Sequence, residues 1–307
     1  MQEIHDIIII GGGPAGYTAA LYAARGGLDT LVLERMSIGG QMTETGSIDN
    51  YPGFEDGIDG VELGMKMQAS AERFGAKTEL ADVTRVELSG KIKRIFTDFG
   101  EYAARAVIIA TGATPRPLGI DGEAELVGRG IHYCAHCDGR FYSDRTLVVV
   151  GGGNSAAEDA LYLSRLAKRV YLVHRRNSLR ADRIYRDAIA RTGNIELLLN
   201  RRVSEIISSQ GRVTGARLAS TVGEGDIEIG VAALFVSIGR DPRSSLFCDQ
   251  LALDAGGYIV ADESTRSSIP GVFAVGDVRT KELRQVVTAV ADGAVAAHYA
   301  EKYLAEE

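Results

Sequence analysis

A glycine-rich turn between an apolar strand and an alanine-rich helix most restricts how this chain of 307 residues can fold, and it occurs twice. The first copy, GGGPAG at residues 11–16, follows the isoleucine run 7–10, and the second, GGGNSA at 151–156, follows the apolar segment 146–150. Apolar, β-branched runs of this kind are typical of parallel strands buried on both faces of a sheet. Because the turns begin 140 residues apart (151 − 11), the sequence predicts two related βαβ nucleotide-binding modules.

Each turn is followed by a predicted helix and a second strand. The first module has a helix over 15–24 and a strand over 30–33. The second module has a helix over 155–167 and a strand over 170–173. Helix and strand alternate in this way in α/β folds with parallel sheets.

The end of the chain does not begin a third module, because a strand runs into Gly276-Asp277 and a closing helix is predicted over 285–303. We therefore expect an α/β fold with two Rossmann-like, three-layer ββα domains, the second inserted into the first. Prolines near residues 115–117 and 241–242 mark the two connections. The expected domains are 1–115 with 243–307, and 116–242.

Composition and charge exclude several classes of function. Lys plus Arg number 34 and Asp plus Glu 41, so the net charge is −7 (34 − 41), which argues against a general nucleic-acid binder. No apolar run approaches the roughly 20 residues that span a bilayer. The N-terminus enters a strand without a visible secretory signal. We expect a cytoplasmic protein with no nucleic-acid or membrane partner.

The first turn has the spacing of a dinucleotide-binding fingerprint. Gly11 permits the tight turn, Gly13 lets the backbone approach a pyrophosphate, and Gly16 lets helix and strand pack closely. The helix N-terminus supplies N–H donors to phosphates. Glu34 ends the next strand and is placed to accept hydrogen bonds from a ribose.

The second turn, at Gly151 and Gly153, is followed by a basic segment instead of an acid. The strand after it ends in the basic residues His174, Arg175 and Arg176, and Arg180 follows. Forked cationic donors suit a 2′-phosphate, so this pattern favours NADPH over NADH. The alternative is a solvated basic stretch that continues in the sequence with Arg183 and Arg186.

Cys134 and Cys137 form a CxxC pair shortly before the second turn. A structural zinc site needs four ligands, and no second Cys or His pair accompanies this one, although His132 and His136 lie near in sequence. A buried, idle pair is a further alternative. We favour a reversible disulfide, because CxxC geometry and nearby positive groups make a thiolate available at neutral pH. No metal is expected.

Two other residues near cysteines carry hypotheses. Asp138 directly follows the CxxC pair and could move a proton to or from a thiolate, or could simply cap a helix or turn. Cys248 is expected to be passive and partly buried.

Polar residues near the C-terminus suggest a flavin site. Gly276-Asp277 could hold the ribityl or pyrophosphate part, and Arg284 and Gln285 open the last helix, where an N–H or a cation could stabilise negative charge on a reduced ring. From these residues alone, ordinary loop and helix-start positions are the favoured interpretation, and the flavin site is the alternative.

Together these motifs resemble the low-molecular-weight, bacterial-type thioredoxin reductases over nearly the full length. The resemblance is carried by GGGPAG at 11–16, GGQ at 39–41, NYPG at 50–53, ATGA at 110–113, CAHCDG at 134–139, GGGNSA at 151–156, HRR at 174–176 with Arg180, and GDV at 276–278 with Arg284-Gln285.

This resemblance implies a homodimer that passes electrons from NADPH through FAD and the Cys134–Cys137 disulfide to thioredoxin. FAD belongs in the discontinuous domain and NADPH in the inserted one. Cys137 faces the flavin, Cys134 attacks the disulfide of the protein substrate, and Asp138 is the acid or base. The residues expected to bind cofactors are Gly11, Gly13, Pro14, Ala15, Gly16, Glu34, Gly40, Gln41, Asn50, Ala110, Thr111, Gly112, Gly151, Gly153, Asn154, Ser155, His174, Arg175, Arg176, Arg180, Gly276, Asp277, Arg284 and Gln285.

His136 departs from the family pattern, which more often has a small polar residue there. The related flavoprotein component of alkyl hydroperoxide reductase commonly has histidine at this place, although it lacks the basic HRR cluster. A reductase of another redoxin or peroxidase partner therefore stays an alternative. A flavin-bound sensing module without turnover is a third hypothesis, which the intact cysteine pair and both nucleotide turns disfavour.

Overall fold

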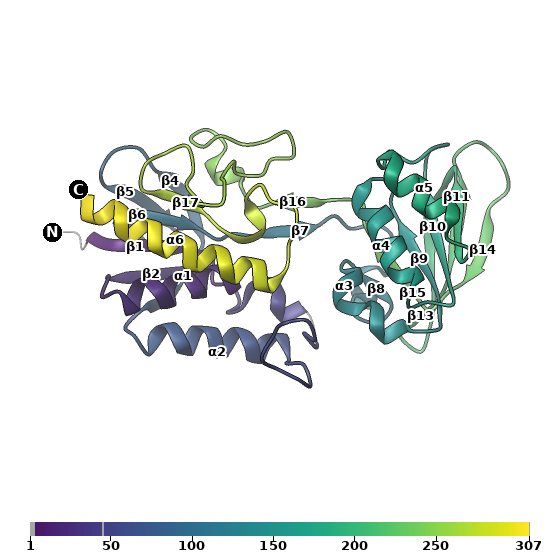
Figure 1. The fold of residues 1–307 in the computed structure, drawn as a ribbon, viewed down its shortest axis with the longest axis horizontal. Helices are drawn as coiled ribbons and strands as arrows, with labels where there is room; N and C mark the ends of the chain where they lie inside the picture. Colours follow the sequence, from purple (N-terminus) through teal and green to yellow (C-terminus); the bar gives the residue numbers. More distant parts are fainter. Residues whose placement is uncertain (1–3, 45, 307) are drawn as a thin grey trace. The chain divides into compact units, whose positions relative to one another are not determined.

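The computed structural model describes residues 4–44 and 46–306. It divides into two units, Met1–Thr114 with Asp241–Glu307 and Pro115–Arg240. The second unit is thus inserted into the first, and the divisions fall slightly before the expected boundaries (114 against 115, and 240 against 242). Strands β7 (Ala113–Pro115) and β16 (Arg240–Pro242) pair where the chain leaves the first unit and returns (Figure 1).

The first unit is built on a sheet with the order β3-β2-β1-β6-β5-β4, and β17 also pairs with β6. Pairing is parallel among β3, β2, β1, β6 and β17, and antiparallel among β4, β5 and β6. The strands are β1 (Ile4–Ile10), β2 (Thr30–Glu34), β3 (Lys77–Leu80), β4 (Val83–Glu87), β5 (Lys93–Thr97), β6 (Glu101–Ile109) and β17 (Val272–Ala274).

Helices cover one face of this sheet. Helix α1 (Pro14–Arg25) lies beside α6 (Val286–Glu306), and both pack with α2 (Gly60–Glu72) around the buried Ile7 and Ile9 (Figure 1). Ile8 and Ile10 point to the opposite face, where the returning segment contributes Phe247 from η4 (Ser245–Phe247). The isoleucine run is therefore buried on both sides of the sheet, as a central parallel strand requires.

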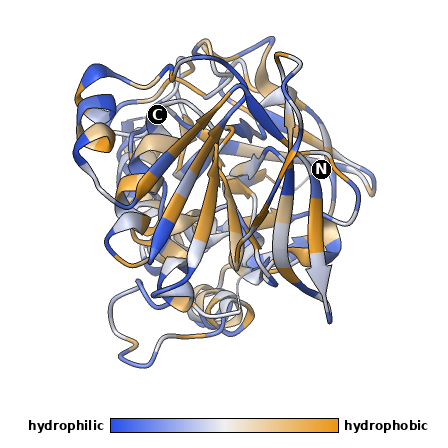
Figure 2. Ribbon diagram, turned by 90° about the vertical axis from the view of Figure 1, so that its right-hand side faces the viewer, coloured by the Kyte–Doolittle hydropathy of each residue, from blue (hydrophilic) through white to orange (hydrophobic). Residues whose placement is uncertain are grey.

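The second unit has three layers. Its parallel sheet has the order β11-β10-β9-β15-β8, and a separate antiparallel sheet has the order β12-β13-β14. One face of the parallel sheet packs against α3, α4 and α5, and the other packs against the antiparallel sheet. Hydrophobic and hydrophilic residues alternate along strands of this unit in Figure 2, as expected where one face of a strand is buried.

The bounds in the second unit are β8 (Ile131–His132), α3 (Ala135–Asp138), β9 (Thr146–Val150), α4 (Asn154–Ser164), β10 (Arg169–His174), α5 (Arg183–Arg191), β11 (Ile195–Leu199), β12 (Arg201–Ser209), β13 (Arg212–Ser220), β14 (Ile227–Gly230) and β15 (Ala233–Val236). Short 3₁₀ turns are η1 (Gly40–Glu44), η2 (Ala124–Leu126), η3 (Gly139–Tyr142) and η5 (Gly276–Val278).

One predicted helix is shorter than expected. The sequence pattern extends the second-module helix to Ala167, but α4 ends at Ser164. Leu163 and Ala167 both stay buried because the chain turns tightly after α4, with the Ala167 N–H donating to the Leu163 carbonyl (2.8 Å). Apolar spacing alone does not distinguish this turn from a continuing helix.

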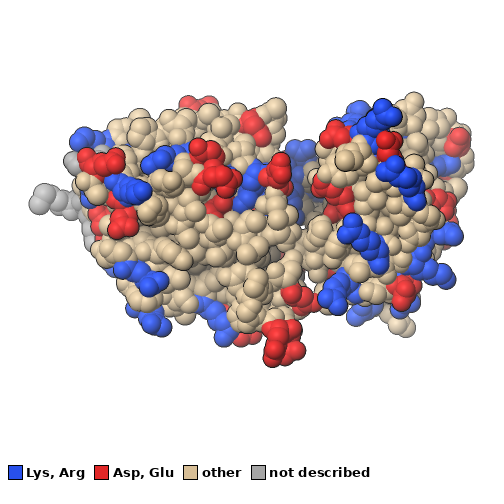
Figure 3. Space-filling model, in the orientation of Figure 1, with Lys and Arg blue, Asp and Glu red and all other residues tan. Residues whose placement is uncertain are grey.

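The surface carries charges of both signs. Lys and Arg side chains are interspersed with Asp and Glu on each unit in Figure 3, so no one-sided basic stripe lies on the face drawn there. None of the described helices is both long and apolar enough to cross a membrane.

Candidate functional site

The first glycine turn brings several expected residues to one place. A Cβ on Gly16 would lie 1.9 Å from the Gly11 carbonyl oxygen, and Gly11 itself has φ +110°, so both positions require glycine. A Cβ on Gly13, by contrast, would meet no atom within 4 Å. The turn therefore leaves open space in front of the α1 N-terminus, which suits a phosphate.

Other expected residues surround this turn. Gly40 lies against it, since a Cβ there would be 3.3 Å from the Gly13 Cα. Ala110 contacts the turn where β6 ends, and Gly276 lies against Ala15 at the start of α1, where a Cβ on Gly276 would be 3.1 Å from the Ala15 Cβ. Four segments far apart in sequence thus meet at one helix N-terminus.

Glu34 is held beside the same turn by backbone donors. Its Oε2 accepts the Gly12 N–H at 2.6 Å, and its Oε1 accepts the Met36 N–H at 3.1 Å. Each carboxylate oxygen keeps a further lone pair, so the carboxylate can still accept a ribose hydroxyl.

The structure adds a pair of buried hydroxyls that the sequence analysis missed. The Tyr17 and Thr78 hydroxyls lie together without a hydrogen bond of ordinary geometry, and a Cβ on Gly12 would be 3.0 Å from the Tyr17 oxygen. Burial raises the pKa of Tyr17 to about 12. In the sequence, the available signal was a polar side chain inside an alanine-rich helix. In the structure, a buried hydroxyl without its full set of hydrogen bonds is a candidate contact for a ligand.

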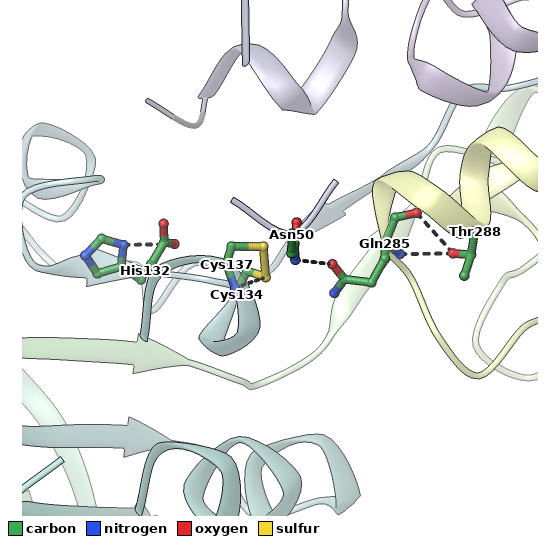
Figure 4. Close-up of a disulfide and its surroundings, with 7 residues drawn as sticks. Asn50, His132, Cys134, Cys137, Gln285 and Thr288 are labelled. Carbon is green, nitrogen blue, oxygen red and sulfur yellow. Dashed lines mark hydrogen bonds and ion pairs between the residues drawn. A yellow bond between two sulfur atoms is a disulfide. The ribbon is translucent and has the colours of Figure 1, made fainter. Parts of the chain in front are cut away.

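Side-chain hydrogen bonds tie the expected flavin residues to neighbouring loops. Asn50 donates to Gln285 (3.1 Å), and the Gln285 N–H donates to the Thr288 hydroxyl (3.1 Å) (Figure 4). The Gln41 amide donates to the Ala113 carbonyl, and the Thr111 hydroxyl donates to the Arg243 carbonyl (2.6 Å). The structure therefore brings Asn50 and Gln285 together.

The turn at Gly276 rests on a buried ion cluster that the sequence analysis did not find. Asp292 Oδ2 accepts the Gly276 N–H (2.9 Å), and the carboxylate also accepts from Arg279 (2.8 and 2.7 Å) and Lys281 (2.8 Å). Burial acts to raise the Asp292 pKa, but hydrogen bonds from Arg279 and Lys281, with their charges, lower it overall. The cluster therefore holds the turn through a carboxylate that stays ionised.

Arg284 sits over an aromatic ring near that turn. Its guanidinium carbon is 4.1 Å from the centroid of the Tyr258 ring. The Arg284 Nε–H donates to the Asp277 carbonyl at 3.5 Å, and an Nη2–H donates to the Arg279 carbonyl at 3.4 Å. These contacts place the expected cation at the beginning of α6.

The second turn is covered by the basic loop. The Gly152 carbonyl accepts the N–H groups of Arg180 (2.7 Å) and Ala181 (3.0 Å). Asn154 and Asp182 exchange two hydrogen bonds of 2.8 Å, which join the first residue of α4 to the residue that precedes α5. The loop that carries the expected arginines is therefore fastened to the turn.

The charged side chains of this loop are arranged so that they can bind an anion. Burial lowers the pKa of His174, and the charges of Arg180, Arg176 and Arg175 lower it further. The His174 Nε2 is buried without a partner. The three arginine side chains are exposed, and none forms an ion pair with a carboxylate of the described residues. Arg183 differs, because it faces Asp187 at 3.5 Å.

Cys134 and Cys137 form a disulfide at the start of α3. Cys134 is the N-cap, and its Sγ accepts the Cys137 N–H at 3.2 Å. The His136 ring between them lies on the Tyr162 ring, with centroids 4.0 Å apart. In the described part of the chain, no group of three or more His, Cys, Asp or Glu side chains is arranged to hold a metal.

Asp138 contacts a buried histidine. Its Oδ2 is 3.0 Å from His132 Nδ1, a contact drawn as a dashed line at His132 in Figure 4. On the other side of the ring, His132 Nε2 is 2.8 Å from the Tyr142 hydroxyl. The Asp138 side chain makes no capping hydrogen bond at α3 or η3. From the sequence, His132 was expected only as a possible zinc ligand. Its actual contacts follow from the short strand β8, which pairs with β15 and places His132 beside Phe235.

Known proteins match this chain over nearly its whole length. Residues 5–293 match the family described as pyridine nucleotide-disulphide oxidoreductase. The chain belongs to this family. A thioredoxin reductase of Listeria monocytogenes is 47% identical over 99% of this chain and 95% of its own length. Another, of Bacillus subtilis, is 43% identical over 99% and 96%.

Solved structures within the family agree. The crystal structure of thioredoxin reductase from Streptococcus pyogenes covers 100% of both chains with a TM-score of 0.93 and 41% identity. That of Lactococcus lactis, titled as the FR conformation, covers 99% of this chain and 100% of its own with a TM-score of 0.69 and 42% identity. The expected α/β fold with two Rossmann-like domains is therefore confirmed.

One expectation about this family member is wrong. Cys248 is exposed, whereas the sequence analysis expected it to be partly buried. The η4 turn directs the neighbouring Phe247 into the core, where it is fully buried, and this leaves Cys248 on the outside.

Proposed function

We propose that this chain is an NADPH-dependent flavoprotein that reduces the disulfide of oxidised thioredoxin or a similar small redox protein. The observation that carries the proposal is the Cys134–Cys137 disulfide in a chain with two separate nucleotide turns. Relatives named thioredoxin reductase support it, and one from Mycobacterium leprae is named a bifunctional thioredoxin reductase/thioredoxin. We further propose a cytoplasmic homodimer.

The residues at the first turn fit FAD. Open space before Gly13, the carboxylate of Glu34 and the unsatisfied Tyr17 hydroxyl suit a pyrophosphate, a ribose and a further polar group. Asn50, Gln285 and the cationic Arg284 would hold the ring system. The proposed FAD domain is 1–115 with 243–307.

The residues at the second turn fit NADPH. Arg175, Arg176 and Arg180 carry charges without carboxylate partners in the described chain, and the neutral His174 ring offers an unpartnered nitrogen. Forked guanidinium groups match a 2′-phosphate. The proposed NADPH domain is 116–242.

Bound FAD supplies a two-electron carrier between the nicotinamide and the disulfide. Reduction of Cys134–Cys137 breaks the S–S bond and takes up two electrons and two protons. Asp138 holds or donates one of these protons at the Cys137 sulfur. The Cys134 thiolate then attacks the partner disulfide and expels one partner thiolate. Cys137 attacks Cys134 next, which releases the second partner thiolate and restores the disulfide.

The test combines purified protein with NADPH or NADH in stopped-flow absorbance, followed by addition of oxidised thioredoxin. We expect rapid flavin bleaching with NADPH and a stoichiometric gain of thioredoxin thiols. Cys134→Ser should abolish disulfide reduction while NADPH still bleaches the flavin. If the parent chain leaves thioredoxin oxidised but reduces another redoxin or a peroxidase partner, the assignment of thioredoxin as the substrate fails. The departure from the family pattern at His136 would then agree with that other partner.

A further inference from the structure

His132 is the buried centre of a polar network next to the disulfide. Its side chain is 6% exposed, and the ring stacks on Phe235 with centroids 5.3 Å apart. Each ring nitrogen nevertheless has a polar partner, Asp138 Oδ2 at 3.0 Å and the Tyr142 hydroxyl at 2.8 Å. A buried imidazole with two such partners is fixed in both position and orientation.

The hydroxyl of Tyr142, which contacts His132 Nε2, stays protonated at neutral pH. Burial raises the pKa of Tyr142, the charge of Asp138 raises it further, and Arg212 opposes the shift. The Tyr142 hydroxyl can therefore either donate to His132 Nε2 or accept a hydrogen bond from it.

This gives the network two complete hydrogen-bond arrangements. With Asp138 ionised, Tyr142 donates to Nε2 and the Nδ1–H donates to the carboxylate. With Asp138 protonated, its O–H donates to Nδ1 and the Nε2–H donates to Tyr142. The arrangements differ by one proton on Asp138 and by the tautomer of a neutral ring, so His132 satisfies both forms of the acid.

We propose that His132 is a positioning residue that holds the Asp138 carboxyl group for proton transfer at the redox disulfide. This inference rests on the acid role of Asp138 in the proposed function. His132 engages Oδ2, and Oδ1 has no hydrogen-bond partner among the described residues. The free oxygen belongs to the residue directly after Cys137, within the same short helix α3.

The step that His132 serves can be isolated with a small dithiol. A dithiothreitol thiolate attacks the Cys134 sulfur, the S–S bond breaks, and the Cys137 sulfur leaves as a thiolate that takes the proton of Asp138. The second dithiothreitol thiol then displaces Cys134 as a cyclic disulfide forms. The reductant loses two electrons and the protein disulfide gains them.

The experiment measures the rate of this reduction in full-length protein at pH 7 without NADPH, by alkylation and mass spectrometry. His132→Gln places its amide nitrogen where Nε2 lies, toward Tyr142, whereas His132→Asn places it where Nδ1 lies, toward Asp138. We expect His132→Gln to slow the reduction about tenfold or more, and His132→Asn to slow it less than threefold.

Asp138→Asn provides the decisive background. We expect this variant alone to be slow, and His132→Gln to change its rate by less than twofold, because the group to be positioned is gone. A merely structural role for His132 would slow both backgrounds equally, and that result would overturn the inference. A normal rate for Asp138→Asn would instead refute the acid role on which both proposals rest.

Should His132→Gln not fold, nitrogen NMR of the histidine rings in the parent chain gives a second measurement. Replacing Asp138 with Asn is expected to move the Nδ1 and Nε2 resonances of His132 through the tautomer exchange. Unchanged resonances would contradict the coupling.

Discussion

The imidazole ring of His174 lies directly against the backbone of Gly152, where a Cβ would come within 2.2 Å of the ring. The Gly152 carbonyl also accepts hydrogen bonds from two N–H groups of the basic loop. The packing of this loop on the turn therefore requires the close approach of His174 to Gly152. We expect Gly152→Ala to push His174 outward, lower the free energy of unfolding by about 1–3 kcal/mol, and weaken NADPH binding at least tenfold. Urea unfolding and a fluorescence titration measure the two effects.

Gly153→Ala is the matched control, because a Cβ at Gly153 would meet no atom within 4 Å. We expect it to change the free energy of unfolding by less than about 1 kcal/mol while still weakening NADPH binding, since the methyl group occupies the space in front of the α4 N-terminus. Equal loss of stability in both variants would contradict the contact between Gly152 and His174.

The buried His174 ring should also make stability depend on pH. Burial and the charges of Arg180, Arg176 and Arg175 lower its pKa in the folded chain, so below about pH 6.5 the unfolded chain binds the proton and the folded chain resists it. The free energy of unfolding therefore falls as pH drops through this range, by at most about 1.4 kcal/mol per pH unit from this one group.

Urea unfolding at pH 7, 6 and 5 tests this expectation. His174→Gln should lose less stability than the parent chain between pH 7 and 5. The exposed His298 offers a control, and His298→Gln should follow the parent curve. Parallel curves for all three proteins would rule out a contribution from His174.

Cofactor preference should depend on the unpaired arginines of the same loop. Replacing both Arg175 and Arg176 with Ala removes charge-assisted donors worth about 1.5–3 kcal/mol each. We expect the Kd for NADPH to rise at least 10-fold and the Kd for NADH to stay within twofold. Arg183→Ala is the control, because Arg183 already faces Asp187 at 3.5 Å. A parallel loss of NADPH and NADH binding would indicate damage to the loop instead of loss of 2′-phosphate recognition.

Much of the fold follows from local sequence signals. Apolar runs that end at glycine turns predict β1 with α1 and β9 with α4, because a buried parallel strand and a close helix start leave few other choices. The end of α4 at Ser164 was not predictable in this way, since the apolar spacing continues to Ala167. Its turn is set by packing that brings Leu163 and Ala167 into one core.

The candidate site was predictable where a residue lies within a motif and not where it comes from a distant segment. Gly13 and Arg175 stand at fixed offsets from their strands. Asp292, by contrast, reaches Gly276 from the second turn of α6, sixteen positions further along the chain. Its spacing from Ala289 and Ala296 puts it on the buried face of that helix, but sequence spacing does not identify the turn that its carboxylate contacts. The partners of His132 likewise depend on the fold around β8 and not on sequence spacing.

The ion cluster behind the Gly276 turn should be essential for both stability and flavin content. Asp292 is 6% exposed and balances Arg279 and Lys281, so Asp292→Asn leaves two cations without their carboxylate. We expect a loss of about 3–5 kcal/mol in the free energy of unfolding. The Gly276 N–H also loses a charged acceptor, so less flavin should copurify with the variant. The ratio of absorbance at about 450 nm, the flavin band, to absorbance at about 280 nm measures this loss.

Glu263→Gln is the matched control for this charge change. Glu263 also faces Arg279, at 4.0 Å, but its side chain is 99% exposed. Solvent screens such a pair, so its loss should alter the free energy of unfolding by less than about 1 kcal/mol and leave flavin content unchanged.

Because the low pKa of Asp292 stabilises the fold above about pH 4, the parent chain should lose this contribution on acidification, while Asp292→Asn should not. A parent and an Asp292→Asn variant of equal stability at pH 7 would show that burial of the carboxylate cancels its attraction to the two cations.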